Sequence, residues 1–268
     1  MKIAIRSMYV APKGKALLAF DLAQAETWVV AHLANEYNMQ DALKNGDIHR
    51  RTASILYNKP EDAITKVERY AGKQNNHAQS YRMGALRLME VFNKNSDKPP
   101  YMTVTLDEAK KMAYKWHGYY HLKSWWDEIE YKLSTQQRTL TTVYGFRRTF
   151  FGQWGDELFK EATAFEPQST VGDHALGAVH PDLGITGGIL GVSRILRPYN
   201  DVKIVHSAHD SITVECPTNL VDELAPIVYK QMYRPLVING VEFSIPVDGE
   251  VGERWGELEK IPKEKLAA

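Results

Sequence analysis

Two acidic positions lie almost the whole chain apart, and each borders strand-like apolar runs. Asp21 follows the run Lys15–Phe20, and Asp210 lies between the runs Val202–Ala208 and Ile212–Cys216. Apolar runs of this length predict β-strands, and a polar pair between two of them predicts a hairpin turn. We therefore expect isolated carboxylates at the ends of strands drawn from both ends of the sequence.

The chain between these strands is dominated by helical patterns. The expected helices follow Ala23 and then cover Met39–Leu43, Ile48–Leu56, Ile64–Val91, Leu106–Leu140, Ala162–Ala178 and Asn219–Tyr233. A hairpin is expected around Gly145, over Thr141–Phe151, and a last strand over Val241–Val247. Asn93–Pro100 is polar and ends in two prolines, which predicts a loop, whereas the glycine-rich run Pro181–Gly191 has no clear assignment.

The composition predicts a globular protein of a reducing compartment. The chain has 268 residues, of which 44% are hydrophobic and 25% charged. Its single cysteine, Cys216, cannot form an internal disulfide. No apolar run approaches the ~20 residues of a membrane span, and residues 1–16 lack the apolar core of a signal peptide. We therefore expect a cytoplasmic protein with no membrane partner.

The net charge of zero argues weakly against a nucleic-acid partner, because proteins that bind phosphate backbones usually carry a basic excess. The distribution of charge weakens that objection. Residues 65–160 hold 16 Lys and Arg against 10 Asp and Glu, whereas residues 215–268 hold 6 against 10. Any DNA-binding face is therefore expected in the middle third.

A stripe of cations and rings runs through the expected helix 64–91. Arg69, Lys73, His77 and Tyr81 recur every four residues, so they drift slowly along one helix face. Such a face offers two cations for triphosphate oxygens and two rings for a base or sugar. Taken alone, a Lys and a His four residues apart more often mark a solvated charged face.

Taken together, three ordered segments resemble the polymerase motifs of the DNA polymerase I family, family A. They read LLAFDLAQAE (Leu17–Glu26), RYAGKQNNHAQSYRMGA (Arg69–Ala85) and VHSAHDSITVEC (Val205–Cys216), and SIPVDGEVGERWGEL (Ser244–Leu258) is similar to the family's C-terminal strand. The resemblance implies an α+β fold, in which a mainly helical fingers subdomain is inserted in an antiparallel-sheet palm. Residues 1–23 and 161–268 would form the palm and residues 24–160 the fingers.

The resemblance also implies template-directed DNA synthesis by a two-metal mechanism. Asp21 and Asp210 would hold two Mg²⁺ ions, which Mn²⁺ can replace, because hard cations prefer rigid carboxylate oxygens. Arg69 and Lys73 would bind the incoming triphosphate, with Lys73 as proton donor to pyrophosphate. Further matches to the nucleotide site are Gln24, Glu26, His49, His77 and Tyr81, and matches to the DNA site are Gln168 and His209.

Several of these matches carry a more specific implied role. Glu26 would close the 2′ side of the sugar pocket, and Tyr81 would pack near the templating position. Gln168 would reach the minor groove of the primer-template, and His209 would touch the primer end. Each match also has an ordinary structural reading, such as a first-turn helix acid for Glu26.

The chain departs from the family pattern at five positions. His77 stands where the family has Phe or Tyr, and Arg82 replaces a glycine. Ser211 stands where many relatives have a second acid, so the sequence assures only two metal carboxylates. Leu22 and Trp28 replace the usual Tyr and Arg.

Only twenty residues precede Asp21, so the sequence predicts that thumb and exonuclease are absent. We expect a split polymerase of a bacterium or phage-infected cell, whose second polypeptide carries the thumb and the N-terminal palm. Two alternatives stay open: a metal-dependent hydrolase using His206, His209 and Asp210, and a non-catalytic DNA-binding subunit of a replication complex. The hydrolase is disfavoured, because residues three apart on a strand point to opposite faces.

Overall fold

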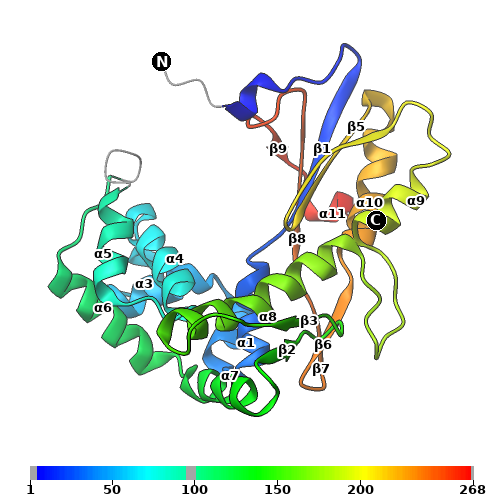
Figure 1. Ribbon diagram of the computed structural model, residues 1–268. Coiled ribbons are helices and arrows are strands. Elements are labelled where there is room, and N and C mark those ends of the chain that lie inside the picture. Colours follow the sequence, from blue (N-terminus) through cyan, green and yellow to red (C-terminus); the bar gives the residue numbers. More distant parts are fainter. Residues whose placement is uncertain (1–4, 95–100, 267–268) are drawn as a thin grey trace. The chain divides into compact units, whose positions relative to one another are not determined.

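The computed structural model describes residues 5–94 and 101–266, which form two compact units (Figure 1). The sheet unit consists of the residues up to 25, residues 142–146 and those from 168 onward. The helical unit consists of residues 26–141 and 147–167. This mixture confirms the predicted α+β class. Within the described ranges, no helix is long and apolar enough to cross a membrane.

The sheet unit is built on a five-stranded antiparallel sheet. Its order is β4 (Lys203–Ala208), β5 (Ser211–Pro217), β1 (Lys15–Leu22), β8 (Val247–Gly252) and β9 (Glu259–Lys260). Leu18, Phe20 and Leu22 of β1 are fully buried, and α10 (Val221–Met232) packs against this strand. Because side chains alternate along a strand, Asp21 points to the other face.

The end of the chain differs from the single strand expected over Val241–Val247. β7 (Val241–Ser244) pairs with β6 (Pro235–Ile238) in a separate two-stranded sheet, and β8 begins only at Val247. Pro246 separates the two strands and has no N–H to donate to a ladder. The chain therefore leaves one sheet and enters the other at this proline.

The glycine-rich run that had no assignment folds against the end of α8 (Asp156–Leu176). α8 begins earlier than the expected Ala162–Ala178 and contains Pro167. At Gly188, the start of α9 (Gly188–Ile195), a Cβ would lie 2.4 Å from the Ala175 carbonyl oxygen. Only glycine permits this approach, and the φ of +56° also favours it.

Most elements of the helical unit are short helices. They are α1 (Ala25–Leu33), α2 (Tyr37–Asn45), α3 (Ile48–Tyr57), α4 (Lys66–Ser80), α5 (Ala85–Lys94), α6 (Leu106–Tyr119) and α7 (Lys123–Thr135), with strands β2 (Thr139–Thr141) and β3 (Arg147–Thr149). α1 starts at the last residue of the sheet unit. The loop expected over Asn93–Pro100 starts inside α5, and its residues 95–100 lie outside the described part.

Two long helices expected from the sequence are each broken in two. The pattern Ile64–Val91 contains α4 and α5, separated where Arg82 adopts a left-handed φ of 60°. The Arg82 guanidinium binds Glu130 and lies 5.6 Å from the Trp126 ring centroid, so contacts distant in sequence hold this break. The pattern Leu106–Leu140 breaks at Tyr120, whose side chain is buried against Trp116.

Close packing of α3 on α4 fixes the geometry of the helical unit. Thr65 and Glu68 form a capping box that starts α4. One turn later, Gly72 faces α3 so closely that a Cβ would lie 2.1 Å from the His49 carbonyl oxygen. Asn76 then accepts hydrogen bonds from Thr52 and from the Trp116 indole, both at 2.8 Å. The absence of a side chain at Gly72 therefore allows this buried network to form.

We predict that Gly72→Ala destabilises the protein by about 1–3 kcal/mol or more, because an added methyl group in this contact must push α3 and α4 apart. Urea denaturation of the purified chain measures the change in the free energy of unfolding. Gly118→Ala on α6 is the matched control, since nothing lies within 4 Å of its Cβ position. Equal stability of the Gly72 variant and the wild type would contradict the packing role.

Candidate active site

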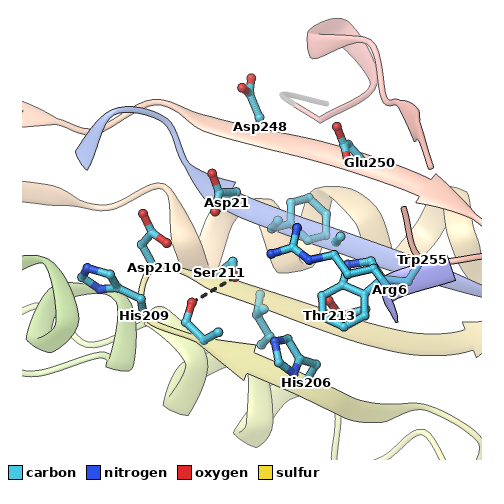
Figure 2. Close-up of a pocket in the computed structure, with 14 residues that line it drawn as sticks. Arg6, Asp21, His206, His209, Asp210, Ser211, Thr213, Asp248, Glu250 and Trp255 are labelled. Carbon is cyan, nitrogen blue, oxygen red and sulfur yellow. Dashed lines mark hydrogen bonds between the residues drawn. The ribbon is translucent and has the colours of Figure 1, made fainter. Parts of the chain in front are cut away.

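A cleft of about 460 Å³ opens on the face of the sheet that carries Asp21 (Figure 2). Asp21 lies near the end of β1, and His209 and Asp210 form the turn between β4 and β5. The Leu22 amide donates to the Asp210 carbonyl at 3.2 Å, which ties the hairpin tip to β1. The structure thus brings together three of the predicted site residues from opposite ends of the chain.

The turn itself is strained at His209. Its φ is +54°, a left-handed value that is uncommon for residues other than glycine. Non-glycine residues persist in this region where the surroundings fix them, and such positions concentrate at functional sites. The strand pairing on one side and the bond from Leu22 on the other fix this turn.

Negative charge is concentrated around Asp21. Partial burial is the largest cause that raises its pKa to about 6, followed by the charges of Asp210 and Asp248, a hydrogen bond with Asp210, and the charge of Glu250. Each of these disfavours the ionised carboxylate. A cation bound in the cleft would offset this repulsion.

Sequence reasoning missed several residues of the cleft. Asp248 and Glu250 come from β8, and Arg6 and Trp255 lie at the other end beside His206, which was predicted only for the hydrolase alternative (Figure 2). The Arg6 guanidinium lies 5.1 Å from the Trp255 ring centroid, and the His206 ring centroid lies 4.6 Å from it. The alternation of Asp248 and Glu250 with buried residues was the available signal for a strand face. The cleft therefore has an acidic end and a cationic, aromatic end.

The chemistry of the acidic end suits a hard divalent cation. Asp21 and Asp210 supply carboxylate oxygens, and the cleft leaves room for water and phosphate oxygens. Among residues 5–94 and 101–266, no group of three or more His, Cys, Asp or Glu side chains converges on one metal position. The three residues that the hydrolase alternative would use, His206, His209 and Asp210, all line the cleft.

In the helical unit, the predicted stripe lies along α4. Lys73 and His77 are exposed, and the His77 and Tyr81 ring centroids are 5.3 Å apart. Arg69 Nε donates to Asp47 Oδ2 at 2.6 Å, and Asp47 also caps α3. The Asp47 contact is a feature of the fold that sequence reasoning did not identify. The contact with Asp47 fixes the side chain of Arg69, the first cation of the stripe, whereas the side chain of Lys73 is exposed to solvent.

His49 lies buried beside the two cations of this stripe. Desolvation, together with the positive charges of Arg69 and Lys73, lowers its pKa to about 4 against the opposing effect of Asp47. Asn76 Nδ2 lies 3.1 Å from His49 Nδ1 and donates to it when His49 is neutral. His49 is therefore uncharged near pH 7, and its ring orientation is fixed by Asn76.

Glu26 and Tyr81, 55 residues apart, meet at one hydrogen bond. Tyr81 Oη donates to Glu26 Oε2 at 2.5 Å. Burial, followed by the negative charge of Glu26, raises the pKa of Tyr81. The phenol therefore stays protonated and holds the carboxylate beside the end of α4.

The two predicted glutamines belong to the sheet unit. Gln24 lies in the turn after β1 with a φ of 57°, and Gln168 is exposed on α8. Their assignment to nucleotide and DNA contacts stays a prediction.

Comparison with known proteins agrees with this arrangement. The chain matches the profile of DNA polymerase family A over residues 1–178. It is 26% identical over 253 residues to DNA polymerase I of Aquifex aeolicus, covering 94% of this chain and 41% of that protein. It is 24% identical over 279 residues to the DNA polymerase of Escherichia phage T5, covering 92% of this chain and 31% of that protein.

A solved structure shares the fold. The POL domain of Pol1 from M. smegmatis, in complex with DNA primer-template and dNTP, superposes with a TM-score of 0.74 at 19% identity, covering 94% of this chain and 42% of that chain. The chain thus spans less than half the length of these relatives. The profile match covers well over half of the chain and confirms the predicted family: the chain belongs to DNA polymerase family A.

Proposed function

We propose that this chain is the catalytic C-terminal part of a DNA polymerase and transfers nucleotides from dNTPs to a primer 3′-hydroxyl on a DNA template. The meeting of Asp21 and Asp210 in one cleft carries the proposal, because these carboxylates come from opposite ends of the sequence. Relatives named DNA polymerase support it, as does the likeness to a polymerase domain bound to primer-template and dNTP.

Asp21 and Asp210 would hold the two Mg²⁺ ions of this reaction, for which Mn²⁺ is a substitute. When bound, such ions lower the pKa of the attacking hydroxyl and neutralise charge on the leaving pyrophosphate. The protein's own contribution is positional: the bond from Leu22 to the Asp210 carbonyl and the pairing of Asp21 with Ser211 keep both carboxylates at one end of the cleft. His209, in the same turn, would touch the primer end.

The helical unit would bind the incoming nucleotide. Arg69 and Lys73 would contact the triphosphate, and Lys73 would donate a proton to the departing pyrophosphate. His49 is neutral and, with Nδ1 accepting from Asn76, would donate a hydrogen bond from Nε2 without adding charge. Arg69 and Lys73 lie on α4 and His49 lies beside them on α3, and hydrogen bonds from charged donors to phosphate oxygens are among the strongest in proteins.

The remaining predicted residues would contact the sugar of the incoming nucleotide and the primer-template duplex. Glu26, held by Tyr81, would close the 2′ side of the sugar pocket, because a carboxylate fixed at that position leaves no space for a ribose hydroxyl. His77 would lie against the sugar or base in place of the usual Phe or Tyr. Gln24 would contact the nucleotide, and Gln168 the minor groove of the primer-template.

We predict that Asp21→Asn and Asp210→Asn each reduce nucleotide incorporation about a thousandfold or more, because each removes a metal-binding charge and little packing. Primer extension with Mg²⁺ measures the loss, and denaturation curves check that the fold is kept. Glu242→Gln, on the exposed side of β7, serves as the control. Primer extension at the wild-type rate in either Asp variant would contradict the metal assignment.

Lys73→Ala is expected to slow incorporation about a hundredfold or more while duplex binding changes little, since its proposed contact is to the triphosphate rather than to the template. Single-turnover extension and fluorescence anisotropy separate the two effects. Lys111→Ala on α6 is a control with the same change of charge. Equal losses of incorporation and duplex binding would show that Lys73 belongs to a solvated charged face and does not contact the triphosphate. They would also favour the alternative function, a non-catalytic DNA-binding subunit.

We further propose that a second polypeptide, carrying the thumb and N-terminal palm, covers an apolar surface of the sheet unit. Ile5, Met8, Tyr9, Val10 and Val205 are 48–75% exposed, and several of them line a groove of about 400 Å³. Contiguous exposed apolar surface normally marks an interface. The edge strand β4, which includes Val205, adds unpaired backbone groups at this surface.

The isolated chain is therefore expected to be a poor polymerase whose DNA binding weakens steeply with salt, because few phosphate contacts remain without a thumb. Light scattering gives its oligomeric state, and extension assays on long templates give its processivity. A stable monomer that synthesises DNA processively without help would contradict the second polypeptide and leave the site assignments standing.

A further inference from the structure

One row of side chains crosses the sheet at the level of Asp21. Strand register places Ser211 of β5 opposite Asp21 on one side and Asp248 of β8 opposite it on the other. Directly opposed residues of an antiparallel pair point to the same face, with Cβ atoms about 4.5–5.5 Å apart. Ser211, Asp21 and Asp248 therefore face the same cleft, which all three line (Figure 2).

Ser211 does not add a charge to this row. It stands where the family resemblance implies a second acid after the turn aspartate, and its hydroxyl donates to the Ala208 carbonyl at 3.0 Å. The hydroxyl is therefore engaged with the backbone of its own hairpin. The β5 side of Asp21 thus lacks the acid that the family pattern places there.

Asp248 supplies a carboxylate on the other side of Asp21. Its side chain is 47% exposed and lines the cleft, and among residues 5–94 and 101–266 its ion-pair partner is Lys260, whose Nζ lies 3.9 Å from Asp248 Oδ2. Lys260 is itself 75% exposed, and a pair at this distance in solvent is weak. The Asp248 carboxylate therefore remains available to a cation in the cleft.

We propose that Asp248 is the third carboxylate of the metal-binding cleft and replaces, from β8, the acid that is missing at Ser211. The proposal rests on the proposed function. Asp248 would act on a bound ion through its charge, directly or through a water molecule that the ion keeps. Mg²⁺ suits this arrangement, since it keeps several waters and binds one or two carboxylates directly.

The test measures Mn²⁺ affinity of the purified chain from the paramagnetic resonance signal of free Mn²⁺, without DNA or nucleotide. Asp248→Asn is expected to weaken binding about three- to tenfold, the size of an interaction between partly hydrated charges at this range. Adding Ser211→Glu to that variant is expected to restore the affinity to within about twofold. Glu242→Gln on β7, which is remote in the strand pairing, is expected to have no effect.

A second variant does not depend on the fold tolerating a change at Asp248. Lys260→Gln removes an exposed charge and is expected to strengthen Mn²⁺ binding about twofold, because Asp248 loses its competing cation. In the Asp248→Asn background the same change is expected to have no effect, so the pair forms a double-mutant cycle.

The outcomes separate this proposal from the proposed function. If Asp21→Asn weakens Mn²⁺ binding while Asp248→Asn leaves it unchanged, the role of Asp248 is overturned and the two-carboxylate site stands. If Ser211→Glu fails to restore binding to the Asp248 variant, the replacement of one acid by the other is overturned. If neither Asp21→Asn nor Asp210→Asn affects Mn²⁺ binding, the metal site of the proposed function is wrong.

Discussion

The pairing of β1 between β5 and β8 is the constraint on which the site depends. β1 comes from the start of the chain, whereas β5 and β8 come from its last third, so their hydrogen bonds close loops of about two hundred residues. Closing such loops costs conformational entropy that burial of Leu18, Phe20 and Leu22 must offset. The same alternation that buries these residues turns Asp21 to the opposite face, where Asp210 of the hairpin turn and Asp248 of β8 also line the cleft.

A similar dependence of charge placement on packing operates in the helical unit. Gly72 lets α3 approach α4, and this approach brings His49 beside Arg69 and Lys73. Burial and the two cations keep His49 neutral. The positive charge beside His49 is therefore carried by Arg69 and Lys73 of α4. A bulkier residue at 72 would alter both the packing and the electrostatics of the same helix. Substitutions of Arg69 or Lys73 alone therefore do not separate the effect of helix packing from the effect of charge on His49.

Sequence patterns located the site residues better than they located the ends of the elements. Asp21 and Asp210 were identifiable through the resemblance to the family motifs, because an Asp at a strand end is by itself more often a turn or helix-cap residue. The break between α4 and α5 was not identifiable, since Arg82 adopts its left-handed φ through contacts with Glu130 and Trp126 more than forty residues away. Asp47 and Asn76 were missed for the same reason: their partners, Arg69 and His49, become neighbours only in the folded chain.

The misplaced final strand is the instructive case. The sequence favoured one strand over Val241–Val247, whereas Pro246 divides it, and the second part, β8, forms the ladder beside Asp21. Shifting the register of a strand by one residue exchanges the side chains on its two faces. Whether Asp248 faces the cleft therefore depends on where β8 begins. With β8 starting at Val247, the alternating residues Val247, Gly249 and Val251 face away from the cleft, and Asp248 and Glu250 face into it. The motif around Asp210 ends at Cys216, and the match of Ser244–Leu258 to the family's C-terminal strand assigns no role to Asp248. The register of the sheet indicates one, because it places Ser211 and Asp248 opposite Asp21 on its two sides, and of these two residues Asp248 carries the charge.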